Sequence, residues 1–436
     1  VRSFMANNKK IVSLPRAVAL DLLNSIFVKK RTLDQAIFAC KNFDTLTRAD
    51  RGFARLLTVT VMRRAGQIDN IIQCFLRKGM PSGARDFKNI LRIACAEILF
   101  LDGKAHAAVD TAVTLVEAKK LLHLKGLANA VLRRLANEGK SKLKGIPVRL
   151  NYPNWLIASW TKHYGSEKAR KIFEICVQEP MLDISVKSEP SYWAKRLDGK
   201  VLANGSIRRK FSGRIENLPG YDEGAWWVQD AGATLPVQLF GKLDGANVLD
   251  VCAAPGGKTA QLLCSGANVT SIDISSVRMR RLKENLDRLG LKAELIHVDI
   301  KKWDTNKLFD FIFLDAPCSA TGTIRRNPDV LIHKTYKDIQ KLSVVQMEIL
   351  QTVSKFVRPG GQLLYCTCSL QYEEGEAQVD HFLSKNKGFS RDPIGAHEIG
   401  NFSDAINENG DLRLLPYHLD GNAGTDGFFA SRLTRK

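Results

Sequence analysis

Short apolar runs alternate with amphipathic stretches in the second half of the chain, and this alternation limits the fold more than any other feature. The runs are Val248–Cys252, Val269–Ile274, Ala293–Val298, Phe309–Leu314, Gln362–Tyr365 and a final candidate edge strand at Phe428–Leu433. Helical stretches such as Ser276–Leu289 and Asp338–Val357 separate them. Strands that alternate with helices are typical of a parallel sheet covered on both faces. Residues 226–436 are therefore predicted to form a doubly wound α/β domain.

The first part of the chain shows helical spacing instead. The expected helices are Pro15–Phe27, Leu46–Arg64, Gln67–Lys78, Asp86–Leu101, His106–Lys120 and Lys125–Asn137. Glycines such as Gly66 punctuate these segments. Residues 1–140 are therefore predicted to form an all-α bundle. The run GKSKLKG at Gly139–Gly145 is typical of a linker, and residues 141–225 are predicted to form a small α+β domain with a helix at Tyr152–Val177.

The excess of basic over acidic side chains lies in the first half of the chain. The 436 residues contain 65 Lys and Arg against 45 Asp and Glu, a net charge of +20. Residues 1–150 hold 28 of these basic and 11 of these acidic side chains, whereas residues 226–436 hold 25 of each. A concentrated positive field attracts a polyanion, and nucleic acid is the obvious candidate, although surface charge also keeps proteins soluble. Four basic pairs are expected to be exposed there: Arg63–Arg64, Arg77–Lys78, Lys119–Lys120 and Arg133–Arg134.

Several classes of protein do not fit this sequence. No apolar run approaches the roughly 18 residues that cross a bilayer, and the first residues, VRSFMANNKK, lack the apolar stretch of a secretory signal. Nine cysteines without a paired C-x-x-C do not make a disulfide framework. We therefore expect a soluble protein of the reducing cytoplasm, with no membrane partner.

The segment VLDVCAAPGGKTAQLL combines a buried strand, a small-residue turn and a helix start. Its small residues, Ala253, Ala254, Gly256 and Gly257, let a ligand press against the backbone. A Walker loop needs glycine six residues before Lys258, and that position is Cys252. The dinucleotide fingerprint G-x-G-x-x-G is also absent. The turn is therefore predicted to be neither an ATP site nor a standard NAD site.

An acidic residue follows each of the next strands: Asp273, Asp299 and Asp315. Open α/β sheets bind ligands at the carboxyl ends of their strands. A carboxylate after the second strand suits two ribose hydroxyls, and Asp299 suits an adenine amino group. A ligand with ribose and base but no phosphate fits S-adenosylmethionine. For any single aspartate, capping a helix N-terminus is an equally good explanation.

Two cysteines, Cys318 in DAPCSATG and Cys368 in LLYCTCSL, lie just past strand ends, beside the predicted cofactor cleft. Most isolated cysteines are small buried hydrophobic residues. A metal site at Cys366 and Cys368 would need further ligands, and no Cys/His cluster of zinc spacing adjoins them, so no metal is expected.

Methyl transfer to a pyrimidine gives such thiols a role. Carbon 5 of a pyrimidine is a poor nucleophile, and a thiolate that adds to carbon 6 activates it toward a sulfonium methyl group. An aspartate that is neutral or shares a proton would stabilise the developing charge on the ring. A second thiol would assist release of the methylated product. The target base must also be unstacked from its neighbours before it can react.

Together CAAPGGK, DAPCSATG and TCS resemble the RNA cytosine-C5 methyltransferases of the Sun/Nol/NOP2 superfamily, in particular the bacterial family that acts on 16S ribosomal RNA. The resemblance extends over the full length, and it implies a NusB-like RNA-binding helical domain at residues 1–140, an intermediate region at 141–225 and a Rossmann-like catalytic domain at 226–436. It also implies 16S rRNA as the partner, either naked or in a small-subunit assembly intermediate.

The site residues follow from this resemblance. Cys368 of TCS would be the nucleophile, Cys318 of PCS would assist product release, and Asp315 would also touch the cytosine. The residues implied to bind S-adenosylmethionine are Cys252, Ala253, Ala254, Pro255, Gly256, Gly257, Lys258, Asp273, Asp299 and Asp315. Cys366 is a third thiol nearby, and we expect it to point to the other face of its strand.

Two alternative functions remain open at this stage. The same chemistry could act on tRNA, although the helical domain argues against this substrate. The chain could also be a non-catalytic RNA-binding assembly factor, although intact cysteine motifs and an intact cofactor loop argue for activity.

Overall fold

The computed structural model describes residues 14–210, 213–419 and 423–436, and its contacts divide the chain into two compact units. The first unit contains the residues up to Ile157 together with Asn327–His333, and the second contains Ala158–Arg326 and Lys334–Lys436. The predicted domain limits at residues 140 and 225 stay a prediction. The first ten residues, expected to carry no secretory signal, lie outside the described residues.

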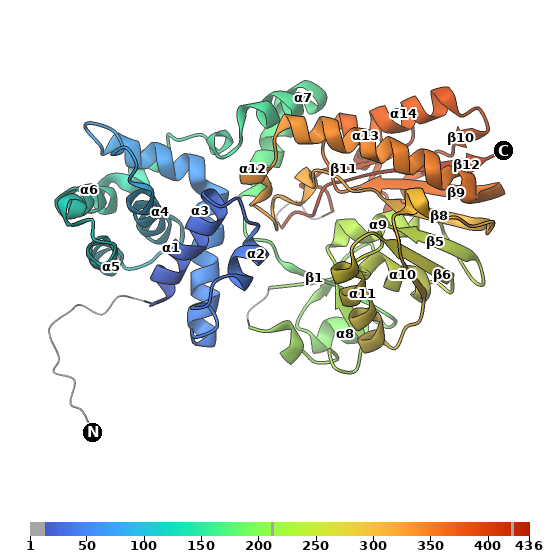
Figure 1. Ribbon diagram of the computed structural model, residues 1–436, viewed down its shortest axis with the longest axis horizontal. Coiled ribbons are helices and arrows are strands. Elements are labelled where there is room, and N and C mark those ends of the chain that lie inside the picture. The colour runs from blue at the N-terminus through green and yellow to red at the C-terminus, as the bar shows by residue number, and fades with distance from the viewer. Residues whose placement is uncertain (1–13, 211–212, 420–422) are drawn as a thin grey trace. The chain divides into compact units, whose positions relative to one another are not determined.

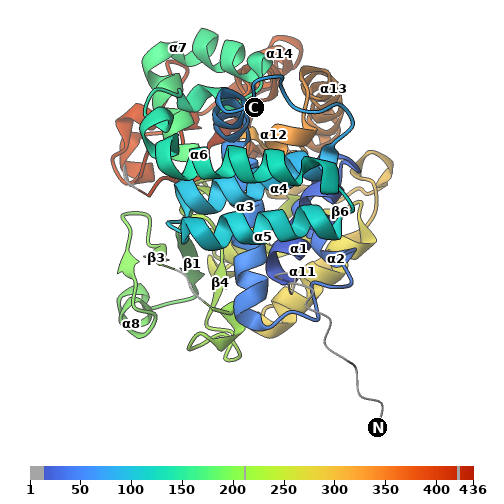
Figure 2. The ribbon, with the colours of Figure 1, turned by 90° about the vertical axis from the view of Figure 1, so that its left-hand side faces the viewer.

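The first unit is built from helices that pack around one core. They are α1 (Leu14–Phe27), α2 (Leu33–Phe38), α3 (Arg48–Cys74), α4 (Arg85–Phe100), α5 (Ala105–Ala118) and α6 (Lys125–Leu143). Figure 2 shows α4, α5 and α6 lying side by side, and each of the three contacts the other two. The short α12 (Val330–His333) also belongs to this unit, where His333 Nε2 lies 2.9 Å from the carbonyl oxygen of Arg31.

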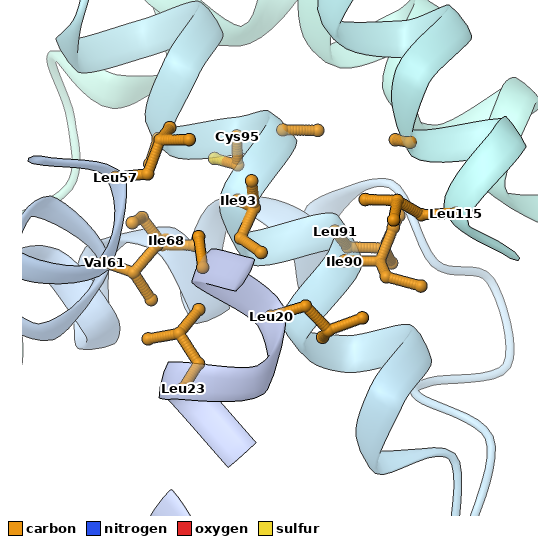
Figure 3. Close-up of a cluster of buried hydrophobic side chains, with 14 of the residues drawn as sticks. Leu20, Leu23, Leu57, Val61, Ile68, Ile90, Leu91, Ile93, Cys95 and Leu115 are labelled. Carbon is orange, nitrogen blue, oxygen red and sulfur yellow. The ribbon is translucent and has the colours of Figure 1, made fainter. Parts of the chain in front are cut away.

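The core of this unit is made of apolar side chains that recur at helical spacing. In Figure 3, Leu20 of α1 points toward Ile90 of α4, Leu23 of α1 points toward Val61 of α3, and Leu57 of α3 belongs to the same cluster. All five side chains are fully buried. This burial supplies the tertiary packing that stabilises amphipathic helices, so the all-α prediction for this part of the chain is confirmed.

Three local predictions in this unit are wrong. The chain does not break at Gly66, because α3 continues through it, and a Cβ there would lie 1.8 Å from the carbonyl oxygen of Leu150. Glycine is needed at this position because the backbone of Leu150 approaches it closely, and not because the chain turns there. The expected linker at Gly139–Gly145 is largely helical, since α6 extends to Leu143. Arg63 is buried rather than exposed, so the pair Arg63–Arg64 is not a free basic patch.

The second unit begins with α7 and a small sheet. The helix α7 (Asn154–Cys176), whose first residues lie in the first unit, is interrupted at Gly165, which has φ 78° and ψ 161°. The strands β1 (Leu182–Val186), β2 (Lys200–Val201), β3 (Ile207–Arg209) and β4 (Trp226–Val228) then pair antiparallel in the order β2-β3-β1-β4, and α8 (Pro190–Arg196) lies between β1 and β2 in the chain. Asp183 and Arg208 form a buried bidentate ion pair across β1 and β3.

The larger sheet of the second unit has the strand order β10-β12-β9-β8-β5-β6-β7, with β11 paired to β12. Its strands are β5 (Asn247–Val251), β6 (Asn268–Asp273), β7 (Glu294–His297), β8 (Phe309–Asp315), β9 (Val357–Thr367), β10 (Phe389–Arg391), β11 (Leu412–Leu414) and β12 (Phe428–Arg435). The strands β9, β8, β5, β6 and β7 are parallel, whereas β10, β11 and β12 run antiparallel to their neighbours. The chain reverses direction across the sheet between β5 and β8, which creates a topological switch point.

Helices cover both faces of this sheet, as the alternating pattern predicts (Figure 1). One face packs against α13 (Tyr336–Val353) and α14 (Glu376–Lys385), and the other packs against α9 (Ala231–Gln238), α10 (Gly257–Cys264) and α11 (Ser276–Leu289). No helix in the described residues is long and apolar enough to cross a membrane. The carboxyl ends of the parallel strands are left for a binding site.

Candidate active site

The turn between β5 and α10 has backbone geometry that requires small residues. Cys252 has a φ of 62° and Gly256 a φ of 99°. A Cβ on Gly256 would lie 2.9 Å from Cγ of Leu282 in α11. The amide N–H of Ala254 donates to Oδ2 of Asp273, and the side chain of Asn285 donates to the carbonyl oxygen of Pro255. The turn is therefore fixed against β6 and α11.

A cavity of about 440 Å³ opens at the carboxyl ends of β5, β6, β7 and β8. This volume is within the range of small-molecule sites. The lining includes six residues that the sequence singled out, namely Cys252, Asp273, Asp299, Asp315, Cys318 and Cys368. Residues 253–258 are not part of the lining, and their role in cofactor binding stays a prediction.

Asp273 and Asp299 both line the cavity, and each carboxylate accepts a hydrogen bond from a nearby backbone amide. Asp273 is 2% exposed, and its Oδ1 accepts a hydrogen bond from the amide of Ser275, just before α11. Asp299 accepts from the amide of Lys301 at the start of a 3₁₀ turn. Asp299 caps the 3₁₀ turn, whereas the N-cap of α11 is Ser275 and not Asp273. Both carboxylates keep lone pairs for a ligand, and their role in cofactor binding stays a prediction.

Asp315 and Lys258 form an ion pair across the switch point. Lys258 Nζ lies 2.7 Å from Oδ2 of Asp315, and the two side chains are 14% and 28% exposed. Burial lowers the pKa of Lys258, but the charge and hydrogen bond of Asp315, together with the nearby Cys366 and Cys368, raise it, and the net pKa is above its usual value. Lys258 therefore stays a cation and fixes the carboxylate beside the cavity.

The two thiols assigned to catalysis are in contact. Sγ of Cys318 lies 3.4 Å from Sγ of Cys368, and both side chains are partly exposed. The hydrogen bond with Cys368 raises the pKa of Cys318 well above its usual value, and burial raises it further. A pair of thiols that shares a hydrogen bond can hold one proton between two sulfur atoms.

Cys366 does not point to the opposite face of β9, so that expectation is wrong. Its side chain is fully buried on the same face as Cys368, and its Sγ lies 3.7 Å from Oδ1 of Asp315. Side chains alternate with a period of two along a strand, so residues 366 and 368 share a face. Burial raises the pKa of Cys366 well above its usual value, which disfavours the thiolate that a nucleophile requires.

Some residues of this site were not singled out from the sequence. Arg278 of α11 lines the cavity, and its Nη1 lies 3.6 Å from Oδ2 of Asp273. Asp250 in β5 is fully buried and accepts a 2.6 Å hydrogen bond from the hydroxyl of Thr259. No local sequence motif marks Arg278, whereas Asp250 could have been noticed as an aspartate inside the apolar run VLDV.

The cavity suits a nucleoside without phosphates. Carboxylates stand at three successive strand ends, and the apolar residues Ile272, Val298 and Ile300 also line the cavity. Carboxylates accept from hydroxyl and amino groups, and the apolar surface suits a base. The described residues contain no group of three or more His, Cys, Asp and Glu side chains that could hold a metal ion.

Comparisons with known proteins agree with this geometry. Residues 237–434 match the family described as 16S rRNA methyltransferase RsmB/F, and residues 13–137 match the NusB family. The chain is 32% identical to the ribosomal RNA small subunit methyltransferase B of Pseudomonas putida, over 97% of this chain and 98% of that protein.

Solved structures show the same fold. The crystal structure of PH0851 has a TM-score of 0.76 at 22% identity and covers 97% of this chain and 100% of its own. A methyltransferase homolog protein from Pyrococcus horikoshii has a TM-score of 0.54 at 26% identity and covers 66% of this chain and 97% of its own. The predicted combination of a NusB-like helical domain with a Rossmann-like methyltransferase domain is confirmed.

Proposed function

The chain belongs to the 16S rRNA methyltransferase RsmB/F family, and we propose that it methylates carbon 5 of one specific cytosine in 16S rRNA through a covalent bond to Cys368. It is an rRNA small-subunit methyltransferase that depends on S-adenosylmethionine. The single observation that supports the finer proposal is the contact between two thiols that line the cavity. Cytosine carbon 5 needs nucleophilic activation, and a thiol supplies it.

Residues around the cavity account for cofactor binding. Asp273 and Asp299 would accept hydrogen bonds from the ribose and the adenine, and Cys252 would lie against the ligand. When bound, S-adenosylmethionine supplies an electrophilic methyl group. Burial raises the pKa of Cys252 to about 12, so this thiol stays protonated and does not compete as a nucleophile.

The two thiols would divide the covalent chemistry between them. The thiolate of Cys368 forms a bond from Sγ to carbon 6 of cytosine, and the electron pair of the C5–C6 double bond becomes available at carbon 5. After methylation, the proton on carbon 5 leaves to water, the double bond forms again and the bond from Sγ to carbon 6 breaks. Cys318 has a raised pKa, so it stays a thiol and donates its S–H to the departing sulfur. The pair holds one proton before and after the cycle.

Asp315 would hold the cytosine beside these thiols. Its carboxylate is fixed by Lys258, and it lies in the same cavity lining as Cys318 and Cys368. A carboxylate accepts from the amino group or a protonated ring nitrogen of cytosine, and such a bond stabilises charge that develops during attack. We assign Asp315 to the base and the cationic Lys258 to the orientation of Asp315.

Substitution of single cysteines tests this function. Cys368→Ala should abolish methyl transfer from labelled S-adenosylmethionine to 16S rRNA and leave cofactor binding intact. Cys318→Ala should leave a covalent protein–RNA band on a denaturing gel, because release is slowed. Cys264→Ala is the matched control, since that thiol is exposed and lies outside the cavity. Unchanged turnover of Cys368→Ala would refute the nucleophile, and transfer to tRNA but not to 16S rRNA would refute the substrate.

A further inference from the structure

A buried carboxylate joins the two segments that carry the catalytic thiols. Oε1 of Glu374 accepts a 2.8 Å hydrogen bond from the amide of Ser319, next to Cys318. Oε2 of the same carboxylate accepts from the hydroxyl of Ser319 and, at 2.5 Å, from the hydroxyl of Ser369, next to Cys368. The side chains of Glu374, Ser319 and Ser369 are all fully buried. One carboxylate therefore holds the residue that follows each thiol.

Glu374 is itself fixed by its surroundings. Gln346 of α13 donates from Nε2 both to Oε1 of Glu374 at 3.0 Å and to the carbonyl oxygen of Pro317 at 2.9 Å, so it links the carboxylate to the residue before Cys318. The backbone carbonyl of Glu374 accepts from the hydroxyls of Tyr365 and Thr367 in β9. Glu374 itself lies in a 3₁₀ turn, Tyr372–Glu374, and donors from β9 and α13 fix it in place, as preorganised sites require.

The four donors to this carboxylate are uncharged, and together they fill its acceptor positions. A carboxylate offers about four lone-pair sites, and Ser319 N, Ser319 Oγ, Gln346 Nε2 and Ser369 Oγ occupy four. An ionised side chain in a fully buried position is costly unless it is well hydrogen-bonded. An alanine or a leucine would serve packing alone at lower cost, so a carboxylate here points to a role in fixing geometry.

We infer that Glu374 is a positioning residue that keeps the thiols of Cys318 and Cys368 in contact, an inference that rests on the two-thiol reaction proposed above. The carboxylate does not line the cavity and does not touch the reacting atoms. It acts through Ser319 and Ser369, whose backbone positions set where the two sulfur atoms lie. A shift of about 1 Å in such a constellation costs on the order of a hundredfold in rate.

The charge of Glu374 has a second effect on the same pair. The pKa of Cys318 is raised first by its hydrogen bond with Cys368 and by burial, and the negative charges of Cys368, Glu374 and Asp315 raise it further. Glu374 thus helps Cys318 to remain the protonated thiol. A glutamine at this position would remove the charge and keep the size, and the serine hydroxyls can turn to accept from its amide.

A trivalent arsenical measures thiol proximity without any need for methyl transfer. Phenylarsine oxide binds two adjacent thiols with release of one water, and a single thiol binds it weakly. The full-length enzyme should bind it tightly, and Cys318→Ala should lose this binding, which assigns the site. Glu374→Ala should bind it at least tenfold more weakly. Glu373→Ala is the matched control, because the Glu373 carboxylate contacts the hydroxyl of Tyr336 instead of either thiol segment, and it should behave as the parent enzyme.

Single-turnover kinetics connects this geometry to the reaction. Glu374→Ala should form the covalent RNA adduct ten- to a hundredfold more slowly, whereas its Kd for S-adenosylmethionine should stay within twofold. Glu374→Gln should recover most of the arsenical affinity. If Glu374→Ala fails to fold, Ser369→Ala answers the same question, because it keeps the carboxylate and removes its bond on the Cys368 side, together with the contacts of this hydroxyl to Gln371, Ser319 and Thr321. It should weaken arsenical binding.

The outcomes separate this inference from the proposed function. Parental arsenical affinity and parental adduct rate in Glu374→Ala, or in Ser369→Ala where the first variant does not fold, would overturn the positioning role. Equal losses in Glu373→Ala would overturn it too, since they would show a general effect of this turn. Failure of the proposed function would give a different result. The parent enzyme would then bind the arsenical through Cys318 but would transfer no methyl group to 16S rRNA.

Discussion

Replacement of Gly256 by alanine should destabilise the second unit more than the same replacement at Gly257 or Gly290. The residue has a φ of 99°, where a side chain is strained by about 1–3 kcal/mol. The added Cβ would also lie 2.9 Å from Cγ of Leu282, and crowding of a packed site costs about 1–3 kcal/mol more. We therefore expect the free energy of unfolding to fall by about 2–6 kcal/mol.

Two other glycines separate these contributions. Gly290 has a φ of 63° at the end of α11, with no atom within 4 Å of a Cβ, so Gly290→Ala should cost only about 1–2 kcal/mol from backbone strain. Gly257 has no positive φ, and its Cβ would find its nearest atoms at 3.8 Å. Gly257→Ala should be neutral or stabilising by about 0.5 kcal/mol, because alanine restricts the unfolded chain.

Urea unfolding followed by tryptophan fluorescence is a suitable assay. Five of the six tryptophans lie in the second unit, and only Trp155 lies in the first. The signal therefore reports mainly on the unit that contains the substitutions. Equal losses in Gly256→Ala and Gly290→Ala would refute the crowding argument. A loss in Gly257→Ala as large as in Gly256→Ala would refute the argument from φ.

Three further predictions concern an ion pair, a titration and RNA binding. Asp183→Asn leaves the guanidinium of Arg208 buried without its bidentate partner, and the free energy of unfolding should drop by about 3–5 kcal/mol in the same fluorescence assay. Burial raises the pKa of Asp250 from 3.8 to about 7. The folded state thus binds a proton that the unfolded state has lost, and stability should fall as the pH rises from about 4 to 7. The stability of Asp250→Asn should be less sensitive to pH over this window. A pH profile of the variant that runs parallel to that of the parent protein would contradict the assignment. Replacement of the exposed pair Arg77–Lys78 by glutamines should flatten the slope of log K against log salt for 16S rRNA by about 1.5, and an unchanged slope in filter binding would mean that this pair only confers solubility.

Much of the fold followed from the sequence because its pattern is local. Helix α11 spans Ser276–Leu289, as the sequence predicted, since apolar residues recur at helical spacing after a serine cap. The continuation of α3 through Gly66 could not be read locally, because the reason is the backbone of Leu150, more than eighty positions away. The burial of Arg63 depends in the same way on tertiary packing, which a run of two arginines does not reveal.

The residues of the site also differ in whether the local sequence pattern reveals them. Asp273, Asp299 and Asp315 were recognisable, because each follows an apolar run that becomes a parallel strand. Arg278 reaches the cavity from the first turn of a helix with no motif around it. Cys366 is a different case, because the period-two rule for strands places it on the same face as Cys368, and the contrary expectation did not apply that rule.

The meeting of the two thiols follows from strand register rather than from either motif alone. Strands β8 and β9 are parallel neighbours, with Asp315 opposite Cys366. From this pair, Cys318 lies three residues further along the chain, past the end of β8, and Cys368 lies two residues further, just past the end of β9. The amide of Ala316 donates to the carbonyl oxygen of Cys366, and that of Gly322 to the carbonyl oxygen of Cys368, so pairing continues past both strand ends. A shift of one residue in this register would turn Cys368 to the opposite face. The two-thiol chemistry therefore depends on β9 pairing with β8 in this register.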